Sequence, residues 1–245
     1  MQVLMMAEKK SRAGSLQSEL RIELHTNYAI GLWEGRKAEK RDDGKKGKQP
    51  IMGMPQFLHR ATQINRDSQQ NEPWADMAML TLEEKIEHAS QQMNEFIASL
   101  DKQMSFVPPG VSITDAQAAE TLDLTVFSGT PLGYRCVFLL MGFDQYAKRV
   151  LQAAHYGVIS RSQRYDMLGS GSRLLREIYG SVLRYRKVGA TRLDAAEDNE
   201  TWRNACESAG EPDRAVLLGE KRSAFSPPVN EASVSLLRLR YKSGQ

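Results

Sequence analysis

The chain has little of what metal sites, disulfide scaffolds and catalytic centres are built from. Its 245 residues include only two cysteines, Cys136 and Cys206, which lie far apart, and four scattered histidines. Two distant cysteines give neither a disulfide framework nor a zinc-ligand spacing, so we predict a cytoplasmic protein with reduced thiols. No two histidines have the i,i+4 spacing of a helical metal site. We therefore expect neither a metal nor a cofactor.

Long apolar runs and catalytic motifs are also missing. No apolar stretch approaches the roughly 20 residues that span a membrane, and the N-terminal apolar residues precede the bases, the reverse of a secretory signal. The loop 44–48 (GKKGK) resembles a phosphate-binding loop, but its last Gly-Lys pair is followed by glutamine instead of Ser or Thr. No motif pairs a nucleophile with a base. These absences predict a protein that is neither membrane-bound nor an enzyme.

What the chain does have is positive charge concentrated in residues 36–48, called here the basic segment. It holds seven bases and three acids, a net charge of +4, whereas the whole chain carries +3. The bases are Arg36, Lys37, Lys40, Arg41, Lys45, Lys46 and Lys48. Because the segment has no apolar residue larger than alanine, it cannot be core, and we predict that it binds DNA phosphates. The alternative is a solvated loop, the commonest state of a charge run.

The hydrophobic pattern predicts an α+β chain that is mostly helical. Period-two alternation predicts strands over 20–25, 122–126, 134–140 and 237–241. Helical spacing and capping residues predict helices over 27–33, 56–65, 81–104, 144–156, 161–185, 191–208 and 212–219. Thr81 to Glu84 matches a capping box, and residues 67–72 a linker. Two glycines, Gly169 and Gly171, fall inside a predicted helix, where either the helix breaks or another backbone approaches closely.

These elements predict three parts of the chain. Residues 1–18 form a flexible N-terminal arm, because they are small and polar after a methionine cluster. Residues 19–189 form a DNA-binding and dimerisation domain that carries a basic insertion over 36–50. Residues 190–245 form a C-terminal helical extension and tail.

The order of elements over 134–185 matches a ribbon–helix–helix unit, in which two chains pair their strands into a ribbon that enters the major groove. Arg135 would then contact a guanine. Ser160, Arg161 and Arg164, at the start of the second helix, would hold a phosphate. The strand over 20–25 is a rival for the ribbon, and strand–helix–helix units also occur in many other α+β domains.

Three longer stretches resemble the AcaB-type family of transcriptional activators of conjugative plasmids and integrative elements. They are SELRIELHTNYAIGLWEGR (18–36), KQPIMGMPQF (48–57) and TPLGYRCVFLLMGFDQYAKRVL (130–151). The resemblance covers about residues 18–190. It implies a homodimeric ribbon–helix–helix DNA-binding protein, with extensions to the core, that activates conjugative-transfer genes.

The sequence thus favours a dimeric, sequence-specific DNA-binding activator. Its expected partners are double-stranded promoter DNA and a second copy of the chain, with RNA polymerase as a further candidate and no membrane. The alternative is a non-enzymatic structural or accessory protein of a conjugation apparatus, which would bind protein partners through the helix over 81–104. A single-strand binder is less favoured, because no predicted strand carries aromatic residues at stacking spacing.

Overall fold

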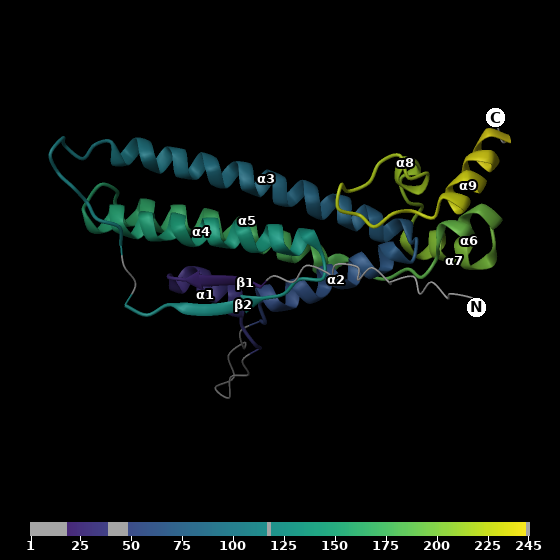
Figure 1. Cartoon of the computed structure of the whole chain (residues 1–245), viewed down its shortest axis with the longest axis horizontal. Coiled ribbons are helices and arrows are strands. Elements are labelled where there is room, and N and C mark those ends of the chain that lie inside the picture. Colours follow the sequence, from purple (N-terminus) through teal and green to yellow (C-terminus); the bar gives the residue numbers. More distant parts are fainter. Residues whose placement is uncertain (1–18, 39–48, 117–118, 244–245) are drawn as a thin grey trace, which may run out of the picture.

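The computed structural model describes residues 19–38, 49–116 and 119–243, without the side chains of 242 and 243. The molecule is elongated: three long helices run side by side, a two-stranded ribbon and two helices flank them, and short helices gather at one end (Figure 1). The predicted flexible arm over 1–18 lies outside the described residues. In the part that is described, no helix is long and apolar enough to cross a membrane.

The described elements confirm a mostly helical α+β chain. In chain order they are β1 (Leu20–Leu24), α1 (Asn27–Glu34), α2 (Met54–Gln69), α3 (Pro73–Met104), β2 (Leu122–Val126), α4 (Pro131–His155), α5 (Arg161–Arg184), α6 (Arg192–Glu197), α7 (Glu200–Ala209), α8 (Arg214–Leu217) and α9 (Glu231–Ser243).

The ribbon consists of β1 and β2 of the same chain, paired antiparallel with Leu20 opposite Val126. Both strands were predicted, and both are confirmed. Ile22 and Leu24 point into the core, while the alternate residues face solvent, as period two requires. Thr26 caps α1, because its hydroxyl accepts a hydrogen bond from the amide of Ala29.

The strand predicted over 134–140 is wrong, because these residues lie within α4. Pro131 occupies the first turn of this helix, where its missing amide hydrogen costs nothing. The helix packs against α3, α5, α1 and α2, so apolar residues cover most of its circumference. An apolar run of that kind does not distinguish a buried helix from a strand. The ribbon–helix–helix unit predicted over 134–185 is therefore also wrong, and Asp144 does not start a helix.

The predicted start of the long helix at Thr81 is wrong as well, since α3 begins at Pro73. The capping-box residues lie two turns inside the helix, where Leu82 and Glu83 are buried. The linker predicted over 67–72 shortens to the turn between α2 and α3. Proline at the first helical position was the better start signal.

The C-terminal region departs from the prediction in two places. The strand predicted over 237–241 is helical and belongs to α9, with Leu237 buried. The helix predicted over 191–208 is two helices, α6 and α7, separated by Asp198 in the left-handed conformation with φ of 53°. Ser160 caps α5 and Thr191 caps α6, and both form complete capping boxes.

One large core joins the ribbon with α1 to α5, and smaller clusters join the C-terminal helices. Cys136 is buried in the large core, as expected of a small apolar residue, and burial raises the pKa of its thiol. α5 continues through both predicted break points. A Cβ atom on Gly171 would lie 2.8 Å from the ring of Phe143, so this glycine makes room for an aromatic ring of α4. Gly169 faces open space.

A single buried carboxylate, that of Asp144 on α4, attaches β1 and α1 to the helical body. It accepts the backbone amides of His25 at 3.0 Å and Thr26 at 2.9 Å, and the Thr26 hydroxyl at 2.7 Å. The Nδ1 atom of His25 lies 2.9 Å from the same carboxylate. The turn between β1 and α1 therefore has its polar groups satisfied inside the protein.

Replacing Asp144 with alanine is expected to lower the free energy of unfolding by about 3 kcal/mol or more, because several buried donors lose their acceptor. Urea denaturation followed by circular dichroism measures the change. Asp166→Ala, which removes an exposed carboxylate of α5, serves as the control and should change stability by less than about 0.5 kcal/mol. Equal stability of the two variants would contradict the assigned role of Asp144.

A second buried carboxylate, that of Asp76 on α3, holds the C-terminal region. It accepts the fully buried guanidinium of Arg192 at 2.7 Å and two nitrogens of Arg222 at 2.9 and 3.0 Å. Arg192 also donates to the carbonyl oxygens of Val216 and Leu217. Two segments of the C-terminal region therefore meet one carboxylate of α3, and Arg192 joins a third segment to them.

Replacing Arg192 with alanine is expected to loosen residues 190–243 and to lower stability by roughly 3–5 kcal/mol, since Asp76 loses a buried partner and two carbonyl oxygens lose their donor. Limited proteolysis with mass spectrometry locates the loosened segment. The control is Arg203→Ala, which removes an exposed pair with Asp198. Cleavage sites that stay the same in both variants would contradict this account.

Candidate nucleic-acid interface

A closed neck, formed by residues 35–36 after α1 and 51–53 before α2, marks the two ends of the basic segment in the described structure. Arg36 and Ile51 exchange two backbone hydrogen bonds, each of 2.8 Å. The guanidinium of Arg36 also donates to the carbonyl oxygen of Gln49, at 2.9 and 3.2 Å. Arg36 and Lys37 are exposed. Lys40, Arg41, Lys45, Lys46 and Lys48 lie outside the described residues.

Two glycines allow the two segments of the neck to pack closely against each other. A Cβ atom on Gly53 would lie 2.4 Å from the carbonyl oxygen of Trp33, and one on Gly35 would lie 2.4 Å from that of Ile51. Gly35 also has a positive φ of 69°, which favours glycine. The close contact fixes the end of α1 against the start of α2, and so sets where the basic segment begins and ends.

α2 continues from the neck and presents a polar, basic face to solvent, called here the α2 stripe. Its members recur every three or four residues along one side of the helix: Gln56, His59, Arg60, Gln63 and Arg66. All are exposed except Gln63, which is half-buried and donates to Asp67. No carboxylate belongs to the stripe, and within the described ranges none pairs with Arg60 or Arg66.

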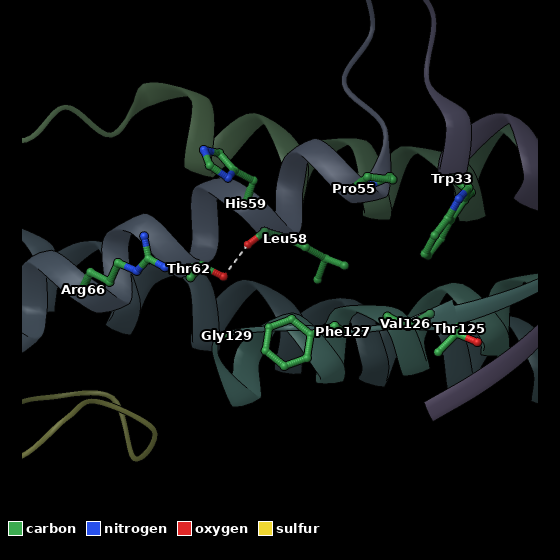
Figure 2. Close-up of a pocket in the computed structure, with 10 residues that line it drawn as sticks. All are labelled: Trp33, Pro55, Leu58, His59, Thr62, Arg66, Thr125, Val126, Phe127 and Gly129. Atoms are coloured by element: carbon green, nitrogen blue, oxygen red, sulfur yellow. Dashed lines mark hydrogen bonds between the residues drawn. The ribbon is translucent and has the colours of Figure 1, made fainter. Parts of the chain in front are cut away.

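A groove of about 440 Å³ runs between α2 and the end of β2. Figure 2 shows His59 and Arg66 on the α2 wall, Phe127 on the opposite wall, and Trp33 and Pro55 at the end beside the neck. The Phe127 side chain is 82% exposed, which is unusual for so large an apolar group. The groove thus joins an apolar surface to the basic side of α2.

The outward face of the ribbon has the opposite charge. Glu23 and Asp123 lie directly across from each other, and the Nε2 atom of His25 is 3.8 Å from the carboxylate of Glu23. The one arginine on this face, Arg21, is 2.9 Å from the carboxylate of Glu19. Three carboxylates on this face thus have two basic neighbours, Arg21 and His25.

Arg135 lies at the interface of α3 and α4, and not on a strand as predicted. Its guanidinium is 3.5 Å from the carboxylate of Glu87 and 3.9 Å from that of Glu83. It also lies over the ring of Phe225, at 5.0 Å from the centroid. Contact with DNA stays a prediction for this residue, and its surroundings give it intramolecular partners instead.

The residues predicted to hold a phosphate, Ser160, Arg161 and Arg164, lie together at the start of α5, and phosphate binding stays a prediction for them. The Ser160 hydroxyl caps the helix, and the guanidinium groups of Arg161 and Arg164 lie over the ring of Tyr165, at 5.7 and 4.7 Å. A hydrogen bond from Arg161 and the nearby positive charge lower the pKa of the Tyr165 phenol.

This group lies far from the neck along the helix. Phe57, just past the neck, packs on Tyr179 of α5 with ring centroids 5.2 Å apart. Tyr179 is 18 residues beyond Arg161 in the same helix, a rise of about 27 Å. Among the described residues, the structure therefore places the predicted site residues in two regions, Arg36 and Lys37 at the neck and the group at the start of α5, with Arg135 in neither.

The sequence prediction missed the bases of α2. His59 was counted only as one of four scattered histidines, and Arg60 and Arg66 were not considered. A signal was present, since every exposed position of the predicted helix over 56–65 is basic or carries an amide. The helix also follows the basic segment directly.

The family is shown by a comparison with family models. The model of the transcriptional regulator AcaB matches residues 12–230, most of the chain. The chain belongs to the AcaB family. This family consists of transcriptional regulators, which agrees with the lack of catalytic motifs in the sequence. No curated protein matches the sequence significantly.

The fold is also similar to a solved structure, the crystal structure of selenomethionine-containing AcaB from uropathogenic E. coli. The two chains superpose with a TM-score of 0.56 over 83% of this chain and 95% of the other, at 14% sequence identity. At this identity the likeness concerns the fold alone. In the described residues, no group of three or more histidine, cysteine or acidic side chains could hold a metal ion.

Replacing Gly53 with alanine is expected to force the neck open and to lower the free energy of unfolding by about 1–3 kcal/mol, because the new methyl group would overlap a backbone oxygen. The matched control is Gly169→Ala, at an open position inside α5, which should raise stability by about 1 kcal/mol. Urea denaturation compares the two. A Gly53→Ala variant at least as stable as the unmodified protein would contradict the close contact.

Proposed function

We propose that this AcaB-family regulator binds double-stranded promoter DNA directly, through the basic segment and the adjoining α2 stripe. The observation that carries the proposal is the neck, which joins the most basic stretch of the chain to a helix whose exposed side has bases and no acid. Phosphates are attracted by clustered bases that no nearby carboxylate neutralises. Membership of a family of transcriptional regulators also supports DNA binding.

The regulator is further proposed to act as a homodimer that activates conjugative-transfer genes. Dimers of one chain commonly bind DNA sites with matching two-fold symmetry. Two copies would bring fourteen bases of the basic segment to one site, so affinity would depend strongly on salt. RNA polymerase is the proposed partner for activation. The bases at the start of α5 would supply a second, separate phosphate contact.

Replacing Lys45, Lys46 and Lys48 with alanine is expected to weaken binding to a promoter fragment from a conjugative-transfer operon at every salt concentration. The slope of log affinity against log salt should fall by about 0.9 for each phosphate that the variant no longer neutralises. For the unmodified dimer, about 6–10 neutralised phosphates would reduce affinity by roughly 10³–10⁵ between 50 and 200 mM salt. Fluorescence anisotropy with a labelled duplex measures both quantities.

The matched control removes the same number of bases elsewhere, by replacing Lys85, Lys102 and Arg203 with alanine. It should bind DNA nearly as well as the unmodified protein, although both triple variants have the same net charge. If the two variants lose affinity equally, general charge is responsible and the basic segment is not the site. If the unmodified protein binds no duplex even at low salt, the proposed function is wrong.

A further inference from the structure

We infer that the open half of a groove between α3 and α4 is the contact surface for RNA polymerase, and that it receives an uncharged loop with an apolar or aromatic anchor residue. The inference rests on the proposed function, because contact with the polymerase is part of the proposed activation. It concerns a surface that the candidate nucleic-acid interface does not use. The surface includes part of the helix over 81–104, which the sequence indicated for protein partners.

The chain itself fills the first half of this groove. Residues 222–227, called here the strap, run from the C-terminal region onto α3, and the ring of Phe225 packs against the large core. The guanidinium of Arg135, on α4, lies over this ring at 5.0 Å from its centroid. Atoms of the strap form hydrogen bonds with three residues on one face of α3: Asp76, Met79 and Glu83.

The second half of the groove is open. The same face of α3 continues at the same spacing of three and four residues, with Ile86, Ser90, Met93 and Ile97. These residues and part of α4 line a cavity of about 240 Å³ that extends about 16 Å along α3. Arg135 lines the cavity and also covers Phe225 of the strap, so the filled and open halves are consecutive parts of one groove.

The open half has room for an apolar side chain. Phe138 on its α4 wall is 56% exposed, and a large aromatic side chain exposed beside an apolar cavity is typical of a protein-binding surface. At Gly142, on the same wall, an added Cβ atom would meet no neighbouring segment within 4 Å. The strap shows what such a site accepts, because the filled half holds an aromatic ring presented by a non-helical segment.

The charges of the cavity favour an uncharged loop. Its one charged lining residue, Arg135, has its guanidinium 3.5 Å from the carboxylate of Glu87. The lining therefore offers no uncompensated charge to a phosphate or to an acidic side chain. The exposed amide of Asn94, which also lines the cavity, can form hydrogen bonds with the backbone of a bound loop.

The position of the groove suits a second partner. α3 lies on the opposite side of α4 and α5 from the ribbon and from α1, which ends at the neck (Figure 1). A protein bound between α3 and α4 would leave the basic segment accessible to DNA. Because the family consists of transcriptional regulators, the polymerase is the protein partner that such a surface would serve.

The test measures DNA binding, polymerase binding and activation separately. The full-length protein is combined with purified RNA polymerase holoenzyme and a promoter fragment from a conjugative-transfer operon. Fluorescence anisotropy gives the affinity for the fragment, biolayer interferometry gives the affinity for the polymerase, and a reconstituted transcription reaction gives the transcript yield.

Two variants change the open half in opposite ways. Gly142→Leu fills the cavity with a side chain, and Phe138→Ala removes the exposed ring. Each is expected to lower the affinity for the polymerase and the transcript yield by about tenfold or more, with an unchanged affinity for the promoter fragment. The matched controls are Gly169→Leu, at an open glycine of α5, and Leu183→Ala, at an exposed leucine of α5. Both controls should behave like the unmodified protein, and circular dichroism checks that every variant is folded.

Several results would overturn the inference while leaving DNA binding intact. They are groove variants that bind the polymerase and activate normally, and an unmodified protein that binds the promoter fragment but not the polymerase. Groove variants that sediment as monomers, beside an unmodified dimer, would show that the groove joins two copies of the chain. Groove variants that lose DNA affinity would show that the groove is not a separate site. By contrast, an unmodified protein that binds no duplex at low salt would contradict the proposed function itself.

Discussion

The buried carboxylate of Asp144 determines where the N-terminal part of the chain lies on the helical body. It holds the turn at His25 and Thr26, which follow β1 and precede α1, although they are more than a hundred residues away in sequence. Since α1 starts at this turn, the carboxylate also sets the position of its end at Glu34, next to the neck. A change in this anchoring would displace the ribbon, the neck and the start of α2 together, so the candidate interface depends on it.

The fold was predictable where an element has a single buried face. β1 and β2 each alternate regularly, and α5 begins with a complete capping box at Ser160, so the strands and this helix start were correct. The prediction failed where packing surrounds an element. α4 contacts four other helices, and its apolar run over 134–140 therefore lost the helical period. Pro131 signals the start of a helix, but the prediction followed the apolar run and assigned a strand.

The candidate site was only partly predictable, for a different reason. Charge density along the sequence identified the basic segment, because its bases are close together in the chain. The bases of α2 are spaced by a helical period and separated by core residues such as Phe57 and Ile64, so a search for charge runs does not find them. For Arg135 the sequence indicates neither a DNA contact nor an intramolecular partner. Its contacts with Glu83 and Glu87 of α3 arise only in the folded structure.

The closed neck has a consequence for how the fold tolerates changes in chain length. Hydrogen bonds join Arg36 to Ile51, so the end of α1 and the start of α2 stay in contact however many residues separate them. The entropic cost of closing a loop rises only slowly with its length. Insertions and deletions between these two residues are therefore expected to leave the helices on either side in place.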